Sequence, residues 1–201
     1  YLKNEKNMGI VYTLNRGLDM AKGEYIARMD SDDISLPTRF EEQLSFLEKH
    51  ENIAVLGTAI NIFGENIESS IFANSSNPQK TKADLFLCSA LAHPTVFIKK
   101  SILNKYHLRY EEEFAGMEDF KLWWEISQFG DIMSLEAPLL NYRKHSSQIT
   151  ATVSEQKTEK AKQFLRERMS VFKIGYSEAE FDSLFKYRSA NFDILTLQDI
   201  E

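Results

Sequence analysis

Segments with the apolar spacing of a helix alternate along this chain with short segments rich in branched and aromatic residues. In residues 8–21 the apolar side chains recur every three or four positions, and Gly23 follows as a helix stop. Residues 24–29 form a strand-like run, and Pro37 lies where the first turn of a second helix is expected. Such alternation is typical of helices that cover a sheet. We therefore predict an α/β sandwich.

The same criteria assign the remaining elements of the first three quarters of the chain. The second helix buries a stripe formed by Phe40, Leu44 and Leu47, and it ends near residue 50. Residues 53–63 and 67–72 form a two-stranded hairpin. The other expected elements are a loop at 73–79, helices at 80–88, 99–106 and 118–129, and strands at 95–98, 132–135 and 139–142, the last two flanking Pro138.

Three carboxylates lie within four residues at the end of the first predicted strand, in the sequence Asp30-Ser31-Asp32-Asp33. A loop after a strand brings these side chains into a small space, where they repel one another unless a positive charge lies between them. Oxygen ligands of this kind suit Mg²⁺ or Mn²⁺ rather than zinc. The alternative is a solvated acidic turn in which Asp33 caps the next helix. From these four residues alone both interpretations stay open.

Composition narrows the class of protein. The chain has 201 residues, of which 43% are hydrophobic, so it can bury a substantial core. Its 30 acidic and 24 basic residues give a net charge of −6 without a dense basic block, which argues against nucleic-acid binding. The single cysteine, Cys88, excludes an intramolecular disulfide and fits a reducing compartment. Apolar stretches are too short to span a bilayer. We expect a cytoplasmic protein with at most peripheral contact with the inner face of the cell membrane.

The composition shifts after about residue 150. Residues 157–173 alternate charges with apolar residues at helical spacing, and Ser177-Glu178-Ala179-Glu180 has the pattern of a capping box. We therefore divide the chain into a domain at 1–150 and a C-terminal helical extension at 151–201. The extension has three possible roles: it covers the core, forms a homodimer with a second copy, or lies against a membrane surface.

A second group of polar residues follows the acidic loop. Glu118 and Asp119 stand at the start of a predicted helix, and His145 follows close after Arg143. This set suits metal-assisted transfer from a phosphorylated donor, in which a metal neutralises a diphosphate leaving group and a carboxylate deprotonates an attacking hydroxyl. Adjacent helix residues project about 100° apart, so Glu118 and Asp119 cannot both point at one substrate atom. One is the base and the other supports it.

The order and spacing of these motifs resemble the family-2 glycosyltransferases, which have the GT-A fold, a Rossmann-like nucleotide-diphospho-sugar transferase fold. The resemblance covers roughly residues 4 to 150. It rests on Asn7-x-Gly9, Asn15-x-Gly17, Ala21-x-Gly23-Glu24-Tyr25-Ile26, Asp30-Ser-Asp32-Asp33, Pro37-x-Arg39, His93-Pro94-Thr95, Glu118-Asp119 and Tyr142-Arg143-x-His145. It implies an inverting enzyme that moves a sugar from a nucleotide-diphosphate sugar to an acceptor hydroxyl.

For the donor side, the resemblance places Asp30 and Asp32 on the DXD motif of the family. Asp32 matches the residue that reaches the Mn²⁺ or Mg²⁺ ion, and Asp30 matches the one near the nucleotide ribose. Asp33 fits a further acidic residue that shapes the donor-sugar or acceptor side. His145 is expected to contact the metal or the diphosphate, with Arg143 beside it.

For the acceptor side, Asp119 matches the general base of inverting members, and Glu118 is expected to orient the acceptor or the loop. His93 precedes Pro94 and an apolar run, so a hydrogen-bonded structural histidine is at least as good an interpretation as a substrate contact. We assign it no catalytic role. Trp123 and Trp124 are expected in the core and the pocket wall rather than as sugar platforms.

The chain departs from the family pattern in two ways. It lacks the first strands of the nucleotide-binding half, so the resemblance implies an N-terminally incomplete domain. It also lacks a Gln-x-x-Arg-Trp motif, because Gln163-Phe-Leu-Arg166 is followed by Glu167. This favours transfer of a single sugar, onto a glycan or lipid-linked acceptor in surface polysaccharide or glycolipid synthesis. The alternative function is a truncated or degenerate sugar-nucleotide-binding module that acts as a non-catalytic interaction partner.

Overall fold

The computed structural model describes residues 2–65, 67–145 and 155–192 of the chain. These residues fall into two compact units. Unit 1 comprises Tyr1–Leu85 and Ser89–His145, and unit 2 comprises Phe86–Cys88 and Ser146–Glu201. The predicted domain boundary at residue 150 lies outside the described residues. The assignment of Phe86–Cys88 to the second unit has no counterpart in the sequence prediction.

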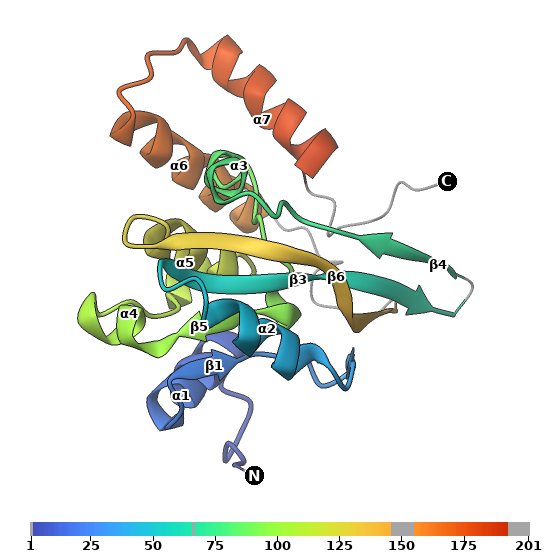
Figure 1. Cartoon of the computed structure of the whole chain (residues 1–201). Coiled ribbons are helices and arrows are strands. Elements are labelled where there is room, and N and C mark those ends of the chain that lie inside the picture. The colour runs from blue at the N-terminus through green and yellow to red at the C-terminus, as the bar shows by residue number, and fades with distance from the viewer. Residues whose placement is uncertain (1, 66, 146–154, 193–201) are drawn as a thin grey trace. The chain divides into compact units, whose positions relative to one another are not determined.

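Unit 1 is built on a mixed sheet (Figure 1). The strand order is β1-β5-β3-β6-β2, and β4 pairs with β3 outside this path. The long strands β3 and β6 run parallel, from the pair Ile53 and Asp131 to the pair Gly64 and Lys144. All other pairs are antiparallel. The strands are β1 (Tyr25–Ala27), β2 (Ile34–Ser35), β3 (Ile53–Gly64), β4 (Ile67–Phe72), β5 (Phe97–Lys99) and β6 (Asp131–Lys144).

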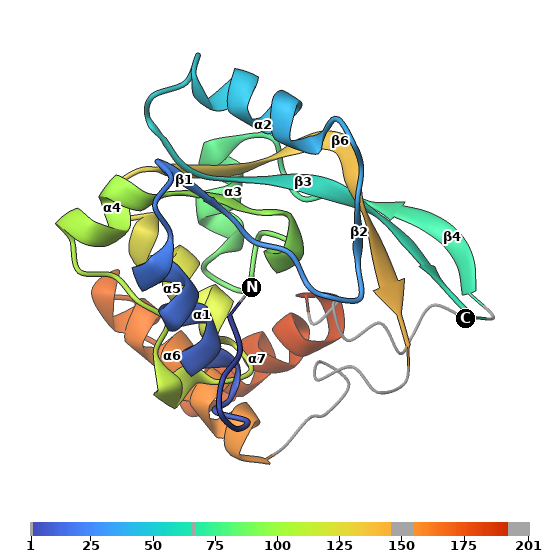
Figure 2. The ribbon, with the colours of Figure 1, turned by 90° about the horizontal axis from the view of Figure 1, so that it is seen from below.

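Helices cover both faces of this sheet, which confirms the predicted α/β fold. Figures 1 and 2 show α2 on one face and α1 and α5 on the other. The core between α2 and the sheet contains buried Leu47, Ile53, Leu56, Phe97 and Met133. The helices are α1 (Ile10–Met20), α2 (Arg39–Leu47), α3 (Pro78–Asp84), α4 (Lys100–Lys105) and α5 (Glu118–Ile126), with 3₁₀ turns at His93–Thr95 and Glu112–Phe114.

The buried face of α2 differs from the prediction. Phe40 was expected in the buried stripe, but 53% of its surface is exposed, while Arg39 and Gln43 are fully buried. The Gln43 Nε2 donates to the carbonyl oxygens of Leu56 (2.8 Å) and Thr95 (2.9 Å). Because the neighbouring backbone offers these acceptors, polar side chains can occupy the buried positions without an orphaned group.

Four predicted boundaries need correction. The segments 132–135 and 139–142 belong to one strand, β6, which continues through Pro138 because register shifts against β3 absorb the missing N–H at this point. The helix predicted at 80–88 is α3, which begins earlier because Asn77 caps it by accepting from the Lys80 N–H, and which ends at Asp84. The strand predicted at 95–98 begins at Phe97, after a 3₁₀ turn. The helix predicted at 118–129 ends at Ile126.

The described residues of unit 2 include two helices, α6 (Glu155–Val171) and α7 (Glu178–Phe192). The predicted capping box is present at the start of α7. Ser177 N–H donates to Glu180 Oε2 at 2.7 Å, and the Glu180 N–H donates to Ser177 Oγ at 3.4 Å. None of the helices in the described part of the chain is both long and apolar enough to cross a membrane.

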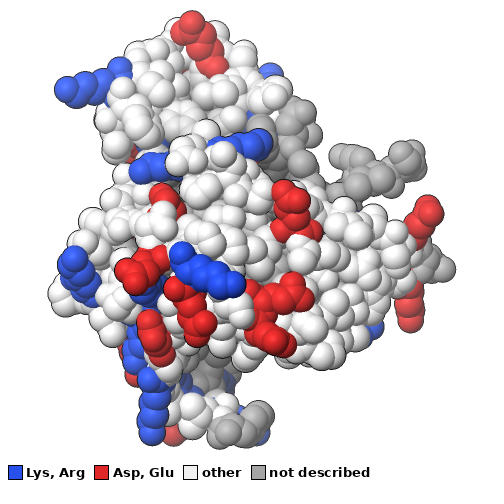
Figure 3. Space-filling model, in the orientation of Figure 1, with Lys and Arg blue, Asp and Glu red and all other residues white. Residues whose placement is uncertain are grey.

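Acidic side chains are prominent on the face shown in Figure 3, with basic side chains among them. The exposed Glu41 and Glu42 lie in helix α2, and the exposed Glu48 follows its last residue. Glu41 and Glu42 lie in the first turn of α2, where the helix dipole favours negative charge. These carboxylates therefore have a local structural explanation that needs no ligand.

Candidate active site

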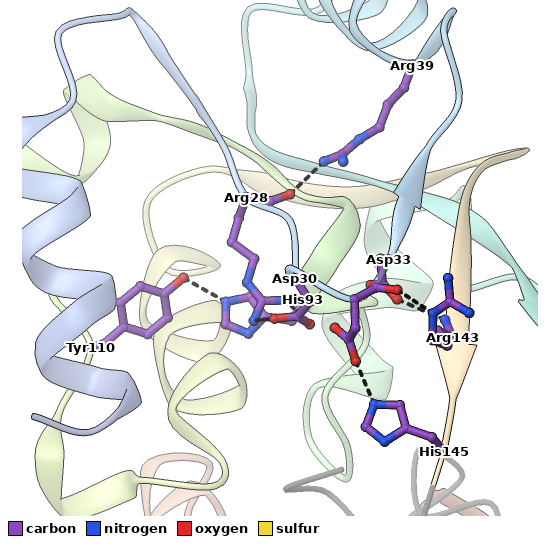
Figure 4. A network of polar contacts seen from close by, with 9 residues as sticks. Arg28, Asp30, Asp33, Arg39, His93, Tyr110, Arg143 and His145 are labelled. Carbon is purple, nitrogen blue, oxygen red and sulfur yellow. Dashed lines mark hydrogen bonds and ion pairs between the residues drawn. The ribbon is translucent and has the colours of Figure 1, made fainter. Parts of the chain in front are cut away.

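The acidic loop (residues 30–33) is held beside the end of β6. It connects β1 to β2, and β2 pairs with β6 through Ile34 opposite Asn141 and Ser35 opposite Leu140. Strand β6 continues for a few residues beyond this pairing and carries Arg143, with His145 directly after it. The short strand β2, absent from the sequence prediction, thus places the loop next to residues more than a hundred positions later (Figure 4).

Asp32 lies against the residues at the end of β6. Its Oδ2 is 2.9 Å from Nε2 of His145, and its main-chain oxygen accepts a hydrogen bond from Arg143 Nε at 2.9 Å. The Arg143 guanidinium also lies over the Phe63 ring, 4.6 Å from its centroid. Contacts to side chain and backbone together fix the position of Asp32. The structure therefore brings together the two residues predicted as metal ligands.

Asp33 is buried, with 7% of its surface exposed. Its Oδ1 accepts a hydrogen bond from the Arg143 N–H at 2.9 Å, while Oδ2 has no hydrogen-bond partner among the described residues. Burial raises the pKa of Asp33 to about 6, despite the hydrogen bond from Arg143. The alternative in which Asp33 caps the next helix is wrong, since α2 begins after Thr38 and no side chain caps it.

Asp30 is paired within the protein. Both Nη atoms of Arg28 contact its carboxylate, Nη1 donating to Oδ2 at 2.7 Å. The Arg28 main chain is fixed in turn, because its carbonyl oxygen accepts from Arg39 Nη2 at 2.8 Å and its N–H donates to the Val96 oxygen. Sequence reasoning missed Arg28. The signal was a cation just after a short strand and two residues before the first of three carboxylates, where a partner is expected.

Glu118 and Asp119 have different surroundings at the start of α5. Glu118 is buried, and its Oε2 accepts a hydrogen bond from the N–H of Gly116, whose φ of 90° is a conformation that glycine adopts without strain. Asp119 Oδ2 accepts a hydrogen bond from Ser89 Oγ at 3.0 Å. Glu118 thus holds the preceding turn. Ser89 was missed because it is 30 residues away in sequence and belongs to no motif.

Burial raises the pKa of both carboxyl groups of this pair. For Glu118 the charge of Asp119 adds to the effect of burial, while the Gly116 N–H and the charge of Arg28 oppose it. For Asp119 the opposing influences are the hydrogen bonds from the Phe120 N–H and Ser89 and the charge of Arg28. Arg28 therefore acts electrostatically on the carboxylates of α5 as well as pairing with Asp30.

His93 and Tyr110 form a buried pair beside this region (Figure 4). The two residues share a hydrogen bond of 2.8 Å between Nε2 and the phenol oxygen. Burial holds the pKa of His93 well below its usual value, with the Arg28 charge adding to the effect, so the ring is neutral. Asn15 fixes the Tyr110 backbone from α1 with hydrogen bonds of 2.8 and 3.0 Å. These contacts agree with the interpretation of His93 as a hydrogen-bonded structural histidine.

The residues around Asp32 fit a divalent cation with few protein ligands. Within the described residues, no three His, Cys, Asp or Glu side chains are grouped closely enough to hold a metal ion. Asp32 and His145 nevertheless present an oxygen and a nitrogen 2.9 Å apart, and Mn²⁺ accepts both ligand types. Sites for ions that act on phosphates commonly use one or two protein ligands and complete their shell with water and substrate phosphates. The donor set present here suits such an ion.

Comparisons with known proteins identify relatives of this chain. Over 141 residues, 67% of this chain and 53% of the other, the chain is 33% identical to the O-antigen biosynthesis glycosyltransferase WbnJ of Escherichia coli. The crystal structure of S. aureus TarS in complex with UDP-GlcNAc superposes with a TM-score of 0.61 at 18% identity, over 93% of this chain and 54% of TarS. The mannosyltransferase PcManGT from Pyrobaculum calidifontis, in complex with GDP-Man and Mn²⁺, gives 0.55 at 12% identity, over 98% and 53%.

The two structural matches show a GT-A-like fold, as predicted. The chain spans about half the length of the curated relatives it matches, for example 57% of an uncharacterized glycosyltransferase of Haemophilus influenzae and 53% of WbnJ. Residues 1–106, more than half of the chain, match the sequence model of the family described as glycosyl transferase family 2. The chain therefore belongs to glycosyl transferase family 2.

Proposed function

We propose that the protein transfers a single sugar from a nucleotide-diphosphate sugar to an acceptor hydroxyl with inversion, in the synthesis of a surface polysaccharide or glycolipid. The observation that carries this proposal is the contact between Asp32 and His145, 2.9 Å apart, in a chain that also holds a separate, half-buried carboxylate, Asp119, by a hydrogen bond from Ser89. One group of residues suits a donor diphosphate, and the other suits an acceptor hydroxyl. Transfer of a glycosyl group needs both.

On the donor side, Asp32 and His145 would hold a divalent cation, Mn²⁺ or Mg²⁺. When bound, such an ion supplies positive charge that stabilises a diphosphate leaving group. Arg143 keeps Asp32 in place through its Nε and is close enough to this group of residues to add positive charge of its own. Asp33, held by the hydrogen bond from the Arg143 N–H, is proposed to shape the donor-sugar or acceptor side of the site. Asp30, held by Arg28, is the candidate for the nucleotide ribose.

On the acceptor side, Asp119 is the proposed general base. Its raised pKa brings a carboxylate closer to the value at which it can take a proton from a hydroxyl group near neutral pH. The proton moves from the acceptor oxygen to a carboxylate oxygen of Asp119, while that acceptor oxygen attacks the sugar carbon opposite the leaving diphosphate. Glu118 supports this step by holding the turn at Gly116, and Ser89 orients the carboxylate.

The printed descriptions of the relatives suggest the substrate class. TarS is described with UDP-GlcNAc, PcManGT with GDP-Man and Mn²⁺, and WbnJ as an enzyme of O-antigen biosynthesis. We therefore propose a UDP-linked or similar hexose or aminohexose as donor and a glycan or lipid-linked acceptor. The reaction is proposed to take place in the cytoplasm, peripheral to the inner face of the cell membrane. From the pattern of the sequence we also propose a homodimer formed through α6 and α7.

A donor panel tests this function. The protein as its gene encodes it and the 201-residue chain are heated with UDP-, GDP- and dTDP-sugars, each with and without Mn²⁺, and the unfolding temperature is recorded. We expect one nucleotide to stabilise the protein in a Mn²⁺-dependent way. Stabilisation without transfer to any acceptor would favour the non-catalytic binding module. The absence of any donor-dependent shift in both samples would refute the proposed function.

Substitution of the proposed base separates binding from chemistry. Asp119→Asn keeps the shape of the side chain but cannot accept the acceptor proton, so transfer should fall by roughly a hundredfold or more while Mn²⁺-dependent donor binding persists. Glu112→Gln changes an exposed carboxylate before α5 in the same way and serves as the control. Equal rates for wild type and Asp119→Asn would exclude Asp119 as the base.

A further inference from the structure

Two arginines of the C-terminal helices bind a three-residue segment from the middle of the chain. Arg168 on α6 donates through Nε to the carbonyl oxygen of Phe86 at 2.9 Å. Arg188 on α7 donates through Nε to the carbonyl oxygen of Leu87 at 2.6 Å. The ring of Phe86 also contacts Phe172, with centroids 5.9 Å apart. These contacts explain why Phe86–Cys88 belongs to unit 2 although more than fifty residues separate it from α6 in sequence.

Both arginines are buried, with exposed fractions of 1% for Arg168 and 8% for Arg188. Burial lowers the pKa of Arg168 to about 9, and the positive charge of Arg188 lowers it further in the same direction. The aliphatic and aromatic surroundings include Phe164, whose ring centroid lies 4.0 Å from the Arg168 guanidinium. Burying two cations near each other is costly unless their hydrogen bonds are used. The carbonyl oxygens of Phe86 and Leu87 each accept from the Nε of one of these buried cations, so loss of either contact removes a hydrogen bond that a buried guanidinium makes.

The residue that follows this segment belongs to the candidate active site. Ser89 is joined by a peptide bond to Cys88, and its hydroxyl donates to Asp119 Oδ2 at 3.0 Å within unit 1. A serine hydroxyl can turn to other acceptors, so its bond to Asp119 depends on the position of its own main chain. Restraint of the two residues before Cys88 reduces the freedom of that main chain. This relation needs only the covalent connection between the two units.

We propose that Arg168 and Arg188 are positioning residues which hold Phe86–Cys88 and thereby keep the Ser89 hydroxyl on Asp119. This gives the C-terminal helices a function within the reaction, and it rests on the proposed role of Asp119 as the base. Neither arginine touches substrate in this proposal. Their loss is expected to change the state of Asp119 and the rate of transfer, while donor binding through the acidic loop is retained.

The first test measures the restraint itself and does not depend on activity. Amide hydrogen exchange of residues 86–92 is compared in the wild type, Arg168→Met and Arg188→Met. We expect faster exchange in both variants, because each loses one bond to this segment. Arg166→Met is the matched control: Arg166 lies on the same helix but pairs with Glu178 at 2.7 Å. Unchanged exchange in residues 86–92 of both variants would overturn the proposal.

The second test asks whether the restraint reaches Asp119. The carboxyl group of Asp119 is titrated by NMR in wild type, Ser89→Ala and Arg168→Met. Loss of the Ser89 hydrogen bond removes an influence that lowers this pKa, so both variants should raise it. Arg28 and Glu118, which also face Asp119, are unchanged in each variant. A raised pKa in Ser89→Ala alone would show that the arginines do not act through Ser89 and would overturn the proposal.

The transfer rate completes a double-mutant cycle. We expect Arg168→Met to slow transfer by roughly tenfold in the wild-type background, as misplacement of a catalytic group does, and to add little in the Ser89→Ala background. Independent, multiplicative losses would contradict the proposed order of action. If no donor is turned over by the wild type, the proposed function fails, while exchange and NMR titration still decide the role of the arginines.

Circular dichroism identifies a variant that does not fold. If Arg168→Met does not fold, amide exchange, NMR titration and the transfer rate are measured on Arg168→Lys and Arg188→Met instead.

Discussion

Gln43 connects three parts of unit 1 through one buried side chain. Its Nε2 donates to the carbonyl oxygens of Leu56 in β3 and Thr95 before β5, and its Oε1 accepts from Arg39 Nε at 3.0 Å. Arg39 in turn donates to the carbonyl oxygen of Arg28, the partner of Asp30. The network therefore joins α2 and the sheet to Arg28, which lies between β1 and the acidic loop.

Gln43→Met removes this network while keeping a side chain of similar length. It leaves the Thr95 carbonyl oxygen and Arg39 Nε without the partner they have in wild type, in a region where Arg39 and Gln43 are fully buried. Each orphaned buried group costs about 1–3 kcal/mol, and added apolar burial recovers about 1 kcal/mol. We therefore expect the free energy of unfolding of unit 1 to fall by about 3 kcal/mol, a large part of the roughly 5–15 kcal/mol of a typical domain.

Urea denaturation followed by tryptophan fluorescence measures this loss, because both tryptophans, Trp123 and Trp124, lie in α5 of unit 1. With a slope of about 2–3 kcal/mol per molar, the midpoint should fall by about 1–1.5 M without a change of slope. Ser45→Met, on the exposed face of the same helix, is the control and should leave the midpoint within about 0.3 M. A midpoint for Gln43→Met that matches this control would refute the reasoning about orphaned groups.

Three further predictions concern the site and the strand ends that carry it. Asp32→Ala should abolish the Mn²⁺ dependence of donor binding in a thermal-shift assay, and a retained Mn²⁺ requirement would exclude Asp32 as a needed ligand. Because burial raises the pKa of Asp119 and the base must be ionised, kcat/KM should fall as the pH is lowered through that raised pKa; a rate that does not fall on acidification of the folded enzyme would contradict this assignment. In Gly64→Ala the new Cβ would clash with the main-chain oxygen of Lys144, so we expect the free energy of unfolding, measured by urea denaturation, to fall by about 1–3 kcal/mol. Gly17→Ala is the control, because no atom lies within 4 Å of its new Cβ, and it should be neutral or stabilising by up to about 1 kcal/mol.

Local patterns predicted the long elements of the fold and missed those created by distant pairing. Helix α1 and the β3–β4 hairpin follow from apolar spacing and from branched residues around a turn. Strand β2 has two residues and exists because Ile34 and Ser35 pair with β6, which no local pattern encodes. The break predicted at Pro138 was wrong for the same reason, since the register shifts against β3 that accommodate the proline are a property of the pair.

The burial of α2 shows why polarity misleads at single positions. Arg39 and Gln43 look like surface residues, and Phe40 looks like a core residue, yet their exposures are reversed. The carbonyl oxygens that accept from Gln43 belong to residues 13 and 52 positions away. Where partners lie that far along the chain, a buried polar residue has the same local pattern as an exposed one.

For the candidate site, the sequence supplied the residue types but not their partners. Asp32 and His145 were named as possible ligands, and their contact joins positions 113 residues apart. Ser89 escaped notice because a lone serine carries no motif, and Arg28 because its place before three carboxylates does not by itself say which of them it pairs with. Their importance depends on which carboxylate each one meets, Asp119 for Ser89 and Asp30 for Arg28.

The repulsion expected among the carboxylates of the acidic loop is resolved by giving each a different partner. Asp30 pairs with Arg28, Asp32 contacts His145, and Asp33 accepts from the backbone of Arg143. These partners are not equivalent. The arginine pair is a charge-assisted bidentate contact, whereas the contact between Asp32 and His145 joins two groups that can both turn to a cation. The loop is therefore fixed at Asp30 by a charged pair. Asp32 is the carboxylate that can give up its contact with His145 to bind a donor-bound metal, or bind that metal together with His145.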